Sequence, residues 1–94
     1  MKIRFVATAR NELRDAARWY ESKQQGLGAQ FKRAIDDTLD RLREYPMSGS
    51  EVSEGVRFAV VSGYPYVLWY ELFGSEILIH AVSHTSRRPG YWQN

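Results

Sequence analysis

The chain of 94 residues contains no cysteine and no segment long and apolar enough to cross a membrane. Without cysteine, neither a disulfide bond nor a zinc site built on thiolates can form. A membrane-spanning helix needs about 20 apolar residues, and the N-terminal segment MKIRFVATAR lacks even the shorter apolar run of a secretory signal peptide. We therefore expect a soluble protein that is not secreted, makes no membrane contact and works in the cytoplasm.

The sequence also lacks the short motifs of well-known enzyme classes. It contains no GxxxxGK loop for nucleotides, no GxSxG motif of hydrolases and no HExxH motif of metalloproteases. The acidic residues Asp36, Asp37 and Asp40 are interspersed with basic residues at helical spacings, which is typical of surface ion pairs. We therefore expect no cofactor and no metal site.

The composition is that of a single folded domain spanning residues 1–94. Hydrophobic residues make up 44% and aromatic residues 14% of the chain, which is enough for a small, dense core. A chain of this size buries only roughly 60–65% of its unfolded surface and has no material for a second core. The net charge of +2 permits nucleic-acid contact without requiring it. Residues 1–50 carry ten Lys/Arg against seven Asp/Glu, whereas residues 51–79 carry one Arg against four Glu.

The first half of the chain predicts a short strand and two helices. In KIRFV, at 2–6, apolar and charged residues alternate with the period of a strand. Thr8 is a candidate N-cap for a first amphipathic helix over residues 9–23. A second apolar stripe of helical period follows the GLG break and stops at Pro46. Because the connection is short, we expect the two helices to form an antiparallel hairpin.

The second half changes from helical to strand periodicity. PMSGSEVSEG, at 46–55, is a polar loop, and three runs rich in β-branched and aromatic residues follow it: VRFAVV, YVLWYEL and ILIHAVSH. Turns that contain glycine separate these runs, so we expect an antiparallel meander. The predicted fold class is α+β with the order β-α-α-β-β-β, a helical hairpin packed on a small, mainly antiparallel sheet that the N-terminal strand is placed to join.

The two histidines, His80 and His84, fall in the last predicted strand. In a regular strand, residues four apart share a face and lie about 13 Å apart, too far for this pair alone to bind one zinc ion. The simpler interpretation is that one histidine packs or lies at the surface and the other ends the strand. His84 is nevertheless next to arginines and a tyrosine, where an imidazole is suited to move protons during phosphodiester cleavage.

Arg57, Arg87 and Arg88 are the basic residues after position 43. A guanidinium suits phosphate and carboxylate equally well, so these residues are candidates to bind RNA, the acidic side chains of a partner or a glutamate of the same chain. Because Arg57 alternates with Val56 and Phe58, we expect it to project from the opposite face of the sheet.

Aromatic residues are frequent in the second half of the chain. Trp69 and Tyr70 lie in the predicted central strand, where we expect them to fill the core. We expect Tyr91 and Trp92 to anchor the C-terminal segment to the edge of the sheet. A base-stacking surface is the alternative for these rings.

Taken in order, several segments resemble the ParE/RelE toxin superfamily, and in particular its plasmid-stabilisation, ParE-like branch. These segments are ARNELRDAARWYE, GLGAQFKRAIDDTLDRLREYP, GVRFAVVSGYPYVLWYEL and ILIHAVSHTSRRPGYW, which together reach from about residue 5 to Trp92. The resemblance implies the toxin of a type II toxin–antitoxin pair, a small cytoplasmic protein neutralised by a cognate antitoxin. The helical hairpin and the adjoining groove of the sheet are the expected antitoxin dock.

The superfamily has two activities. RelE-like members cleave mRNA on the ribosome, using basic residues on the central strands and an arginine and a tyrosine near the C-terminus, whereas ParE-like members inhibit DNA gyrase. In this chain Phe58, Val60 and Val67 stand where the ribonucleases typically have lysine or arginine. A sheet that neutralises RNA phosphates is also not expected to carry an acidic excess.

The first hypothesis is therefore a toxin that acts by binding DNA gyrase, without catalytic residues. The alternative is an mRNA endoribonuclease acting on the ribosome, with His84 as general acid or base, Arg57 and Arg87 stabilising developing charge and Tyr91 orienting the 2'-hydroxyl. The third hypothesis is a degenerate family member that is inert or keeps only antitoxin binding.

Overall fold

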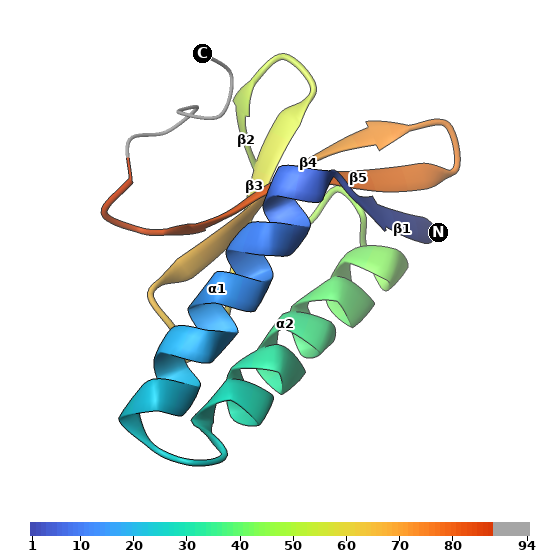
Figure 1. Ribbon diagram of the computed structural model, residues 1–94. Coiled ribbons are helices and arrows are strands. Elements are labelled where there is room, and N and C mark those ends of the chain that lie inside the picture. The colour runs from blue at the N-terminus through green and yellow to red at the C-terminus, as the bar shows by residue number, and fades with distance from the viewer. Residues whose placement is uncertain (88–94) are drawn as a thin grey trace.

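The computed structural model describes residues 1–87, so the predictions for Arg88, Tyr91 and Trp92 lie outside the described residues. The secondary-structure elements follow one another in the order β1 (Lys2–Phe5), α1 (Ala7–Lys23), α2 (Leu27–Glu44), β2 (Ser50–Ser53), β3 (Val56–Val60), β4 (Tyr66–Phe73) and β5 (Glu76–His84). The two helices form an antiparallel hairpin that covers one face of the sheet (Figure 1). The predicted α+β fold class is confirmed.

The sheet has five strands in the order β1-β5-β4-β3-β2. β3, β4 and β5 pair antiparallel in turn, which confirms the predicted meander of three strands, and β2 adds a further antiparallel strand to β3. β1 joins the far edge and runs parallel to β5. A parallel neighbour requires a long crossover, and the helical hairpin is part of that crossover.

The start of each helix is determined by the backbone of the residue before it. α1 begins at Ala7, its N-cap is Val6, and no side chain caps it, so the prediction of Thr8 as N-cap is wrong. The reason is that the Val6 N–H donates to Ile79 O at 3.1 Å, so the pairing with β5 fixes where the strand ends and the helix begins. α2 follows Gly26, whose φ of 92° confirms the glycine turn. Within residues 1–87, neither helix is long and apolar enough to cross a membrane.

The segment expected to be a wholly polar loop contains the edge strand β2. Ser50 lies opposite Phe58 and Glu51 opposite Arg57, although all four residues of β2 are exposed. Exposure on both faces explains why no apolar period reveals the strand in the sequence. Its position is set by backbone pairing with β3, and the polar composition suits an edge that must not pair further.

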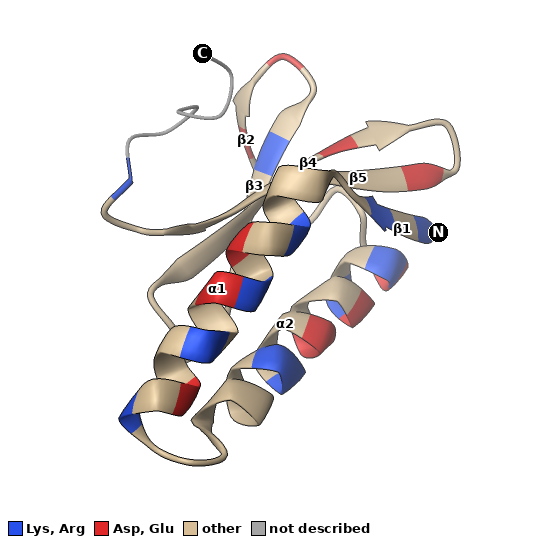
Figure 2. Cartoon of the chain, viewed as in Figure 1, with Lys and Arg blue, Asp and Glu red and all other residues tan. Residues whose placement is uncertain are grey.

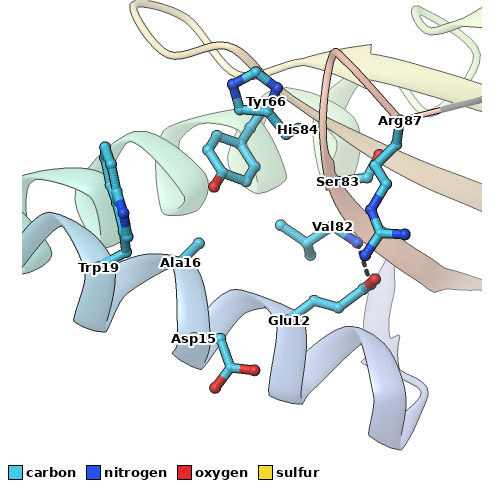
Figure 3. A pocket seen from close by; sticks show the side chains of 9 residues that line it. All are labelled: Glu12, Asp15, Ala16, Trp19, Tyr66, Val82, Ser83, His84 and Arg87. Carbon is cyan, nitrogen blue, oxygen red and sulfur yellow. Dashed lines mark hydrogen bonds between the residues drawn. The ribbon is translucent and has the colours of Figure 1, made fainter.

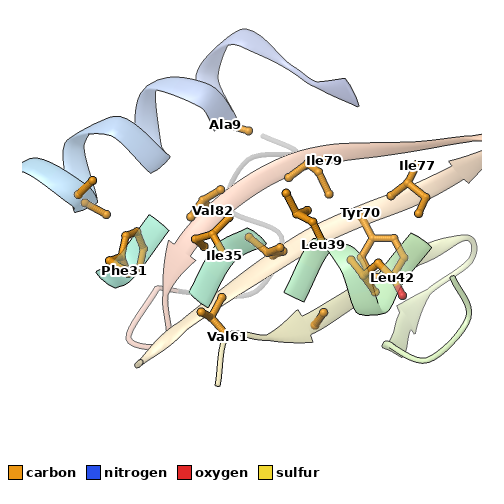
Figure 4. Close-up of a cluster of buried hydrophobic side chains, with 14 residues drawn as sticks. Ala9, Phe31, Ile35, Leu39, Leu42, Val61, Tyr70, Ile77, Ile79 and Val82 are labelled. Atoms are coloured by element: carbon orange, nitrogen blue, oxygen red, sulfur yellow. The ribbon is translucent and has the colours of Figure 1, made fainter. Parts of the chain in front are cut away.

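The main core lies between the helical hairpin and the sheet (Figure 4). Its largest fully buried side chains are Tyr70, Phe31, Ile35, Leu42, Leu68, Ile77 and Ile79. A second, smaller cluster lies on the other face of the sheet, where Trp69 packs against Val56, Val67 and Ala81. The expectation that Trp69 and Tyr70 fill the core is confirmed. Their side chains pack on opposite faces of the sheet.

A bulge in β5 changes the direction of the histidines. Trp69 lies opposite Ala81 but Tyr70 lies opposite Ile79, so His80 is an extra residue in β5. An extra residue reverses the alternation of side chains beyond it. His80 therefore lies with Glu71, whose Oε1 accepts its Nε2–H at 2.6 Å, on the helix-free face. The expectation that His80 and His84 share a face is wrong.

Candidate binding groove between α1 and β5

A groove of about 330 Å³ lies where α1 crosses the C-terminal end of β5. Figure 3 shows the nine side chains that line it. They are Glu12, Asp15, Ala16 and Trp19 from α1, Tyr66 from β4, and Val82, Ser83, His84 and Arg87 from β5 and the residues after it. Two of the residues predicted from the sequence, His84 and Arg87, therefore lie together in one hollow.

The groove exists because β5 is longer than its partner at the edge. β1 pairs with β5 only as far as Ile79, and α1 begins directly afterwards. Beyond that point the outer edge of β5 has no strand beside it within residues 1–87. There the Val82 N–H donates to Oε1 of Glu12 at 2.9 Å. A side chain of α1 thus satisfies a backbone donor that a neighbouring strand would otherwise take.

His84 is exposed at the mouth of the groove and its ring is oriented by local contacts. The Ser86 N–H donates to Nδ1 at 3.0 Å, so Nδ1 carries a lone pair and the neutral ring holds its proton on Nε2. The ring packs edge-on against Tyr66, with a centroid separation of 5.4 Å. Neutral His84 therefore presents a donor, not a general base, at Nε2.

Arg87 continues from His84 through a tight turn in which the Arg87 N–H donates to His84 O at 3.0 Å. Its guanidinium points back across the groove towards Glu12 (Figure 3). Both residues also border a second hollow, of about 240 Å³, on the helix-free face of the sheet. His84 and Arg87 thus stand at the end of the sheet, where its two faces meet.

From the sequence, the helical hairpin is expected to form part of a binding surface, but no residue of α1 is singled out for it. Glu12, Asp15 and Trp19 follow one another at spacings of three and four, so they form a stripe next to the apolar face of the helix. The Trp19 side chain is 54% exposed, and Lys23 Nζ lies 5.0 Å from the centre of its ring. An exposed tryptophan on an amphipathic helix was the available signal for a binding surface.

Arg57 lies in a different environment. Its Nη1 donates to Gly49 O at 2.8 Å and to Met47 O at 3.2 Å, and its Nη2 lies 3.7 Å from Glu51 Oε1. The side chain is only 16% exposed. As expected, Arg57 projects from the face opposite Val56, which belongs to the cluster on the helix-free face.

Tyr70 completes the same network. Its hydroxyl accepts the Gly49 N–H at 3.0 Å and donates to Pro46 O at 2.8 Å. Burial raises the pKa of Tyr70, so the hydroxyl keeps the proton with which it donates. Arg57 and Tyr70 together hold the loop between α2 and β2.

The structure does not bring Arg57 to His84. Arg57 lies opposite Tyr70 on one side of β4, and His84 lies opposite Tyr66 on the other side. Tyr66 and Tyr70 are four positions apart in β4, which is about 13 Å along the strand. Tyr91, the remaining member of the predicted catalytic set, lies outside the described residues. Within residues 1–87 no group of three or more acidic, histidine or cysteine side chains is placed to hold a metal ion.

The comparisons with known proteins match most of the chain. The family described as "ParE toxin of type II toxin-antitoxin system, parDE" matches residues 3–89. Among solved structures, the chain is similar to "Chromosomal ParDE TA system from P. aeruginosa", with a TM-score of 0.65, 20% sequence identity and coverage of 89% of this chain and 95% of that chain. At this identity the likeness shows a shared fold. No curated protein sequence matches the chain.

Proposed function

Because the chain belongs to the ParE toxin family of type II toxin–antitoxin systems, we propose that it is a cytoplasmic toxin that inhibits DNA gyrase by binding and is neutralised by a cognate antitoxin. The match over residues 3–89 is the observation that carries the proposal. No cofactor takes part, because inhibition by binding needs no chemical step.

The groove between α1 and β5 is the proposed antitoxin dock. It combines an exposed tryptophan, side chains of both charges and an edge of β5 that pairs with no strand of residues 1–87 beyond Ile79, where Glu12 accepts the Val82 N–H. A partner segment gains backbone hydrogen bonds when it adds to a strand edge, and an amphipathic helix gains apolar contacts in such a groove. Trp19 is the expected anchor, since exposed aromatic residues supply much of the binding energy of interfaces.

Binding of the antitoxin is tested with two matched substitutions. Trp19→Ala removes an aromatic side chain from the groove, and Tyr45→Ala removes one that is 60% exposed and does not line it. We expect Trp19→Ala to weaken the affinity for the protein encoded beside the toxin by about tenfold or more, and Tyr45→Ala to leave it within about twofold. Equal losses of affinity in the two variants would show that the antitoxin does not bind in the α1–β5 groove.

Two features of the sheet support inhibition by binding over RNA cleavage. Phe58, Val60 and Val67 occupy positions on the central strands where ribonucleases of the superfamily typically carry basic residues. Arg57, the basic residue that these strands do have, donates to two backbone carbonyls of the α2–β2 loop. A guanidinium engaged in this way is not free to stabilise a phosphate in a transition state.

A ribosome-dependent endoribonuclease is the second candidate function, and the pair His84 and Arg87 favours it. Both are exposed at the same end of the sheet, where an imidazole N–H and a guanidinium face one hollow. Expression of the toxin alone separates the candidates. A gyrase inhibitor arrests growth with broken DNA and intact mRNA, a ribonuclease arrests growth with cut mRNA, and folded protein without arrest indicates an inert family member.

A further inference from the structure

The helical hairpin carries a separate hollow, of about 490 Å³, that shares no residue with the α1–β5 groove. It lies between α1 and α2, and its rim carries Arg14 and Arg18 from α1 and Lys32 from α2. All three residues are exposed. Figure 2 shows basic residues on α1 and on the neighbouring stretch of α2. The hollow is therefore a concentration of positive charge on the outer side of the hairpin.

The charges of Arg14 and Arg18 are weakly compensated, whereas Lys32 attracts the Glu21 carboxylate and contributes to the lowering of its pKa. Arg14 makes no ion pair within residues 1–87. Arg18 reaches only Asp15, at 4.0 Å, and both side chains are more than two-thirds exposed, so the pair contributes little. Glu21 is the carboxylate of the lining, and it accepts the N–H groups of Gly26 and Gly28 at 3.0 and 2.9 Å.

The floor of the hollow is made of small residues. A Cβ atom on Gly28 would lie 2.8 Å from Ala17 O, so glycine is required for the close contact of the two helices. Ala17, Gly28 and Ala29 leave no large apolar side chain in the lining. Protein partners usually need aromatic or aliphatic anchors in a pocket. A nucleic-acid backbone needs cations and close approach, which this surface provides.

We propose that this hollow binds the phosphate groups of a nucleic-acid backbone without regard to base sequence. Arg14 and Arg18 are four residues apart on one face of α1, about 6 Å along the helix, and Arg10 continues the row by another turn. Lys32 faces them from α2. Guanidinium groups bind phosphate oxygens bidentately, and contacts to phosphates carry no sequence information.

The proposal is tested with the full chain and a fluorescent duplex of about 20 base pairs of arbitrary sequence. Three phosphate contacts give a slope of roughly −2.7 for log K against log salt, so affinity is expected to fall about 40-fold between about 50 and 200 mM NaCl. The variant Arg14→Gln/Arg18→Gln/Lys32→Gln is expected to lose most of the binding and nearly all of this slope. Circular dichroism during thermal unfolding verifies that it remains folded.

A second variant controls for net charge. Lys2→Gln/Arg4→Gln/Arg43→Gln removes the same number of positive charges from exposed residues outside the hollow. We expect this control to keep most of the affinity and a slope close to that of the unmodified protein.

Three results would overturn the proposal. Equal losses in the two variants would indicate diffuse attraction by net charge. Absence of salt-dependent binding by the unmodified protein would show that the hollow does not bind a nucleic-acid backbone. Tighter binding of a polyglutamate peptide than of the duplex would identify an acidic protein segment as the partner. None of these measurements involves gyrase or antitoxin, so they are independent of the proposed toxin activity.

Discussion

Two arginines of this protein, Arg57 and Arg87, stand in opposite situations although the sequence presents them as equivalent candidates. Arg57 is almost enclosed and donates to two carbonyls of the loop that follows α2. Arg87 is exposed at the rim of the α1–β5 groove. The role of each arginine therefore depends on the hydrogen-bond acceptors around it. One end of the sheet is closed by hydrogen bonds, and the other, which we call the open end, carries the α1–β5 groove with Arg87 at its rim.

The largest effect is expected from Tyr70, at the closed end. Tyr70→Ala removes a fully buried ring and is expected to lower the free energy of unfolding by about 3–5 kcal/mol. Tyr70→Phe keeps the ring but leaves Gly49 N–H and Pro46 O without the hydroxyl, at a cost of about 1–2 kcal/mol. Urea unfolding measures both values. A neutral Tyr70→Phe would show that water replaces the hydroxyl and that the loop is not held as described.

Exchanging the two arginines for glutamine tests the comparison directly. Arg57→Gln is expected to lower the free energy of unfolding by about 1.5–3 kcal/mol, because hydrogen bonds from a charged donor are lost. Arg87→Gln is expected to change it by less than about 0.5 kcal/mol, as is usual at exposed positions. The affinity for the antitoxin is expected to fall about tenfold in Arg87→Gln and not to fall in Arg57→Gln. If both substitutions destabilised the protein equally, the division into a closed and an open end would fail.

Glu12 tests how the open edge is protected. Glu12→Ala removes the acceptor of the Val82 N–H, and we expect a loss of about 1–2 kcal/mol in the free energy of unfolding and faster hydrogen exchange at the Val82 amide. Asp15→Ala is the matched control, since Asp15 lies on the same helix and accepts no backbone hydrogen bond among the described residues. Unchanged exchange at Val82 after loss of Glu12 would mean that the edge needs no side-chain acceptor.

The smallest effect concerns Glu21, at the turn of the helical hairpin. Hydrogen bonds from Gly26 N–H and then Gly28 N–H lower the pKa of this carboxyl from its ordinary value of 4.5. The ionised form therefore stabilises the fold above pH 4.5, and this contribution is lost as the pH falls through the lowered pKa. The stability difference between the unmodified protein and Glu21→Gln should thus narrow between neutral and strongly acidic pH. A difference independent of pH would contradict the role of the charge.

The order of helices and strands was predictable because apolar periodicity follows directly from which faces are buried. The stripe of α2 and the runs of β3, β4 and β5 are all of this kind. β2 escaped prediction because it buries neither face. The start of α1 also escaped it, because the hydrogen bond from Val6 to Ile79 depends on a residue far along the chain.

The candidate site was predictable only in part. His84 and Arg87 were correctly selected as neighbours, since two residues close in sequence at a strand end remain close in space. Their partners from α1, among them Glu12 and Trp19, come from the other end of the chain and are brought there by tertiary packing. The bulge at His80 had no signal in the pattern, and it determined which histidine faces the groove.

We propose that this member of the ParE toxin family acts by binding gyrase. The supercoiling of relaxed plasmid DNA by purified gyrase, measured in the presence of the purified toxin, tests this proposal. We predict inhibition by the unmodified protein and by His84→Ala alike, relieved by added antitoxin. Undisturbed supercoiling, together with cuts in ribosome-bound mRNA that His84→Ala abolishes, would rule out gyrase inhibition and assign the protein to the ribonucleases.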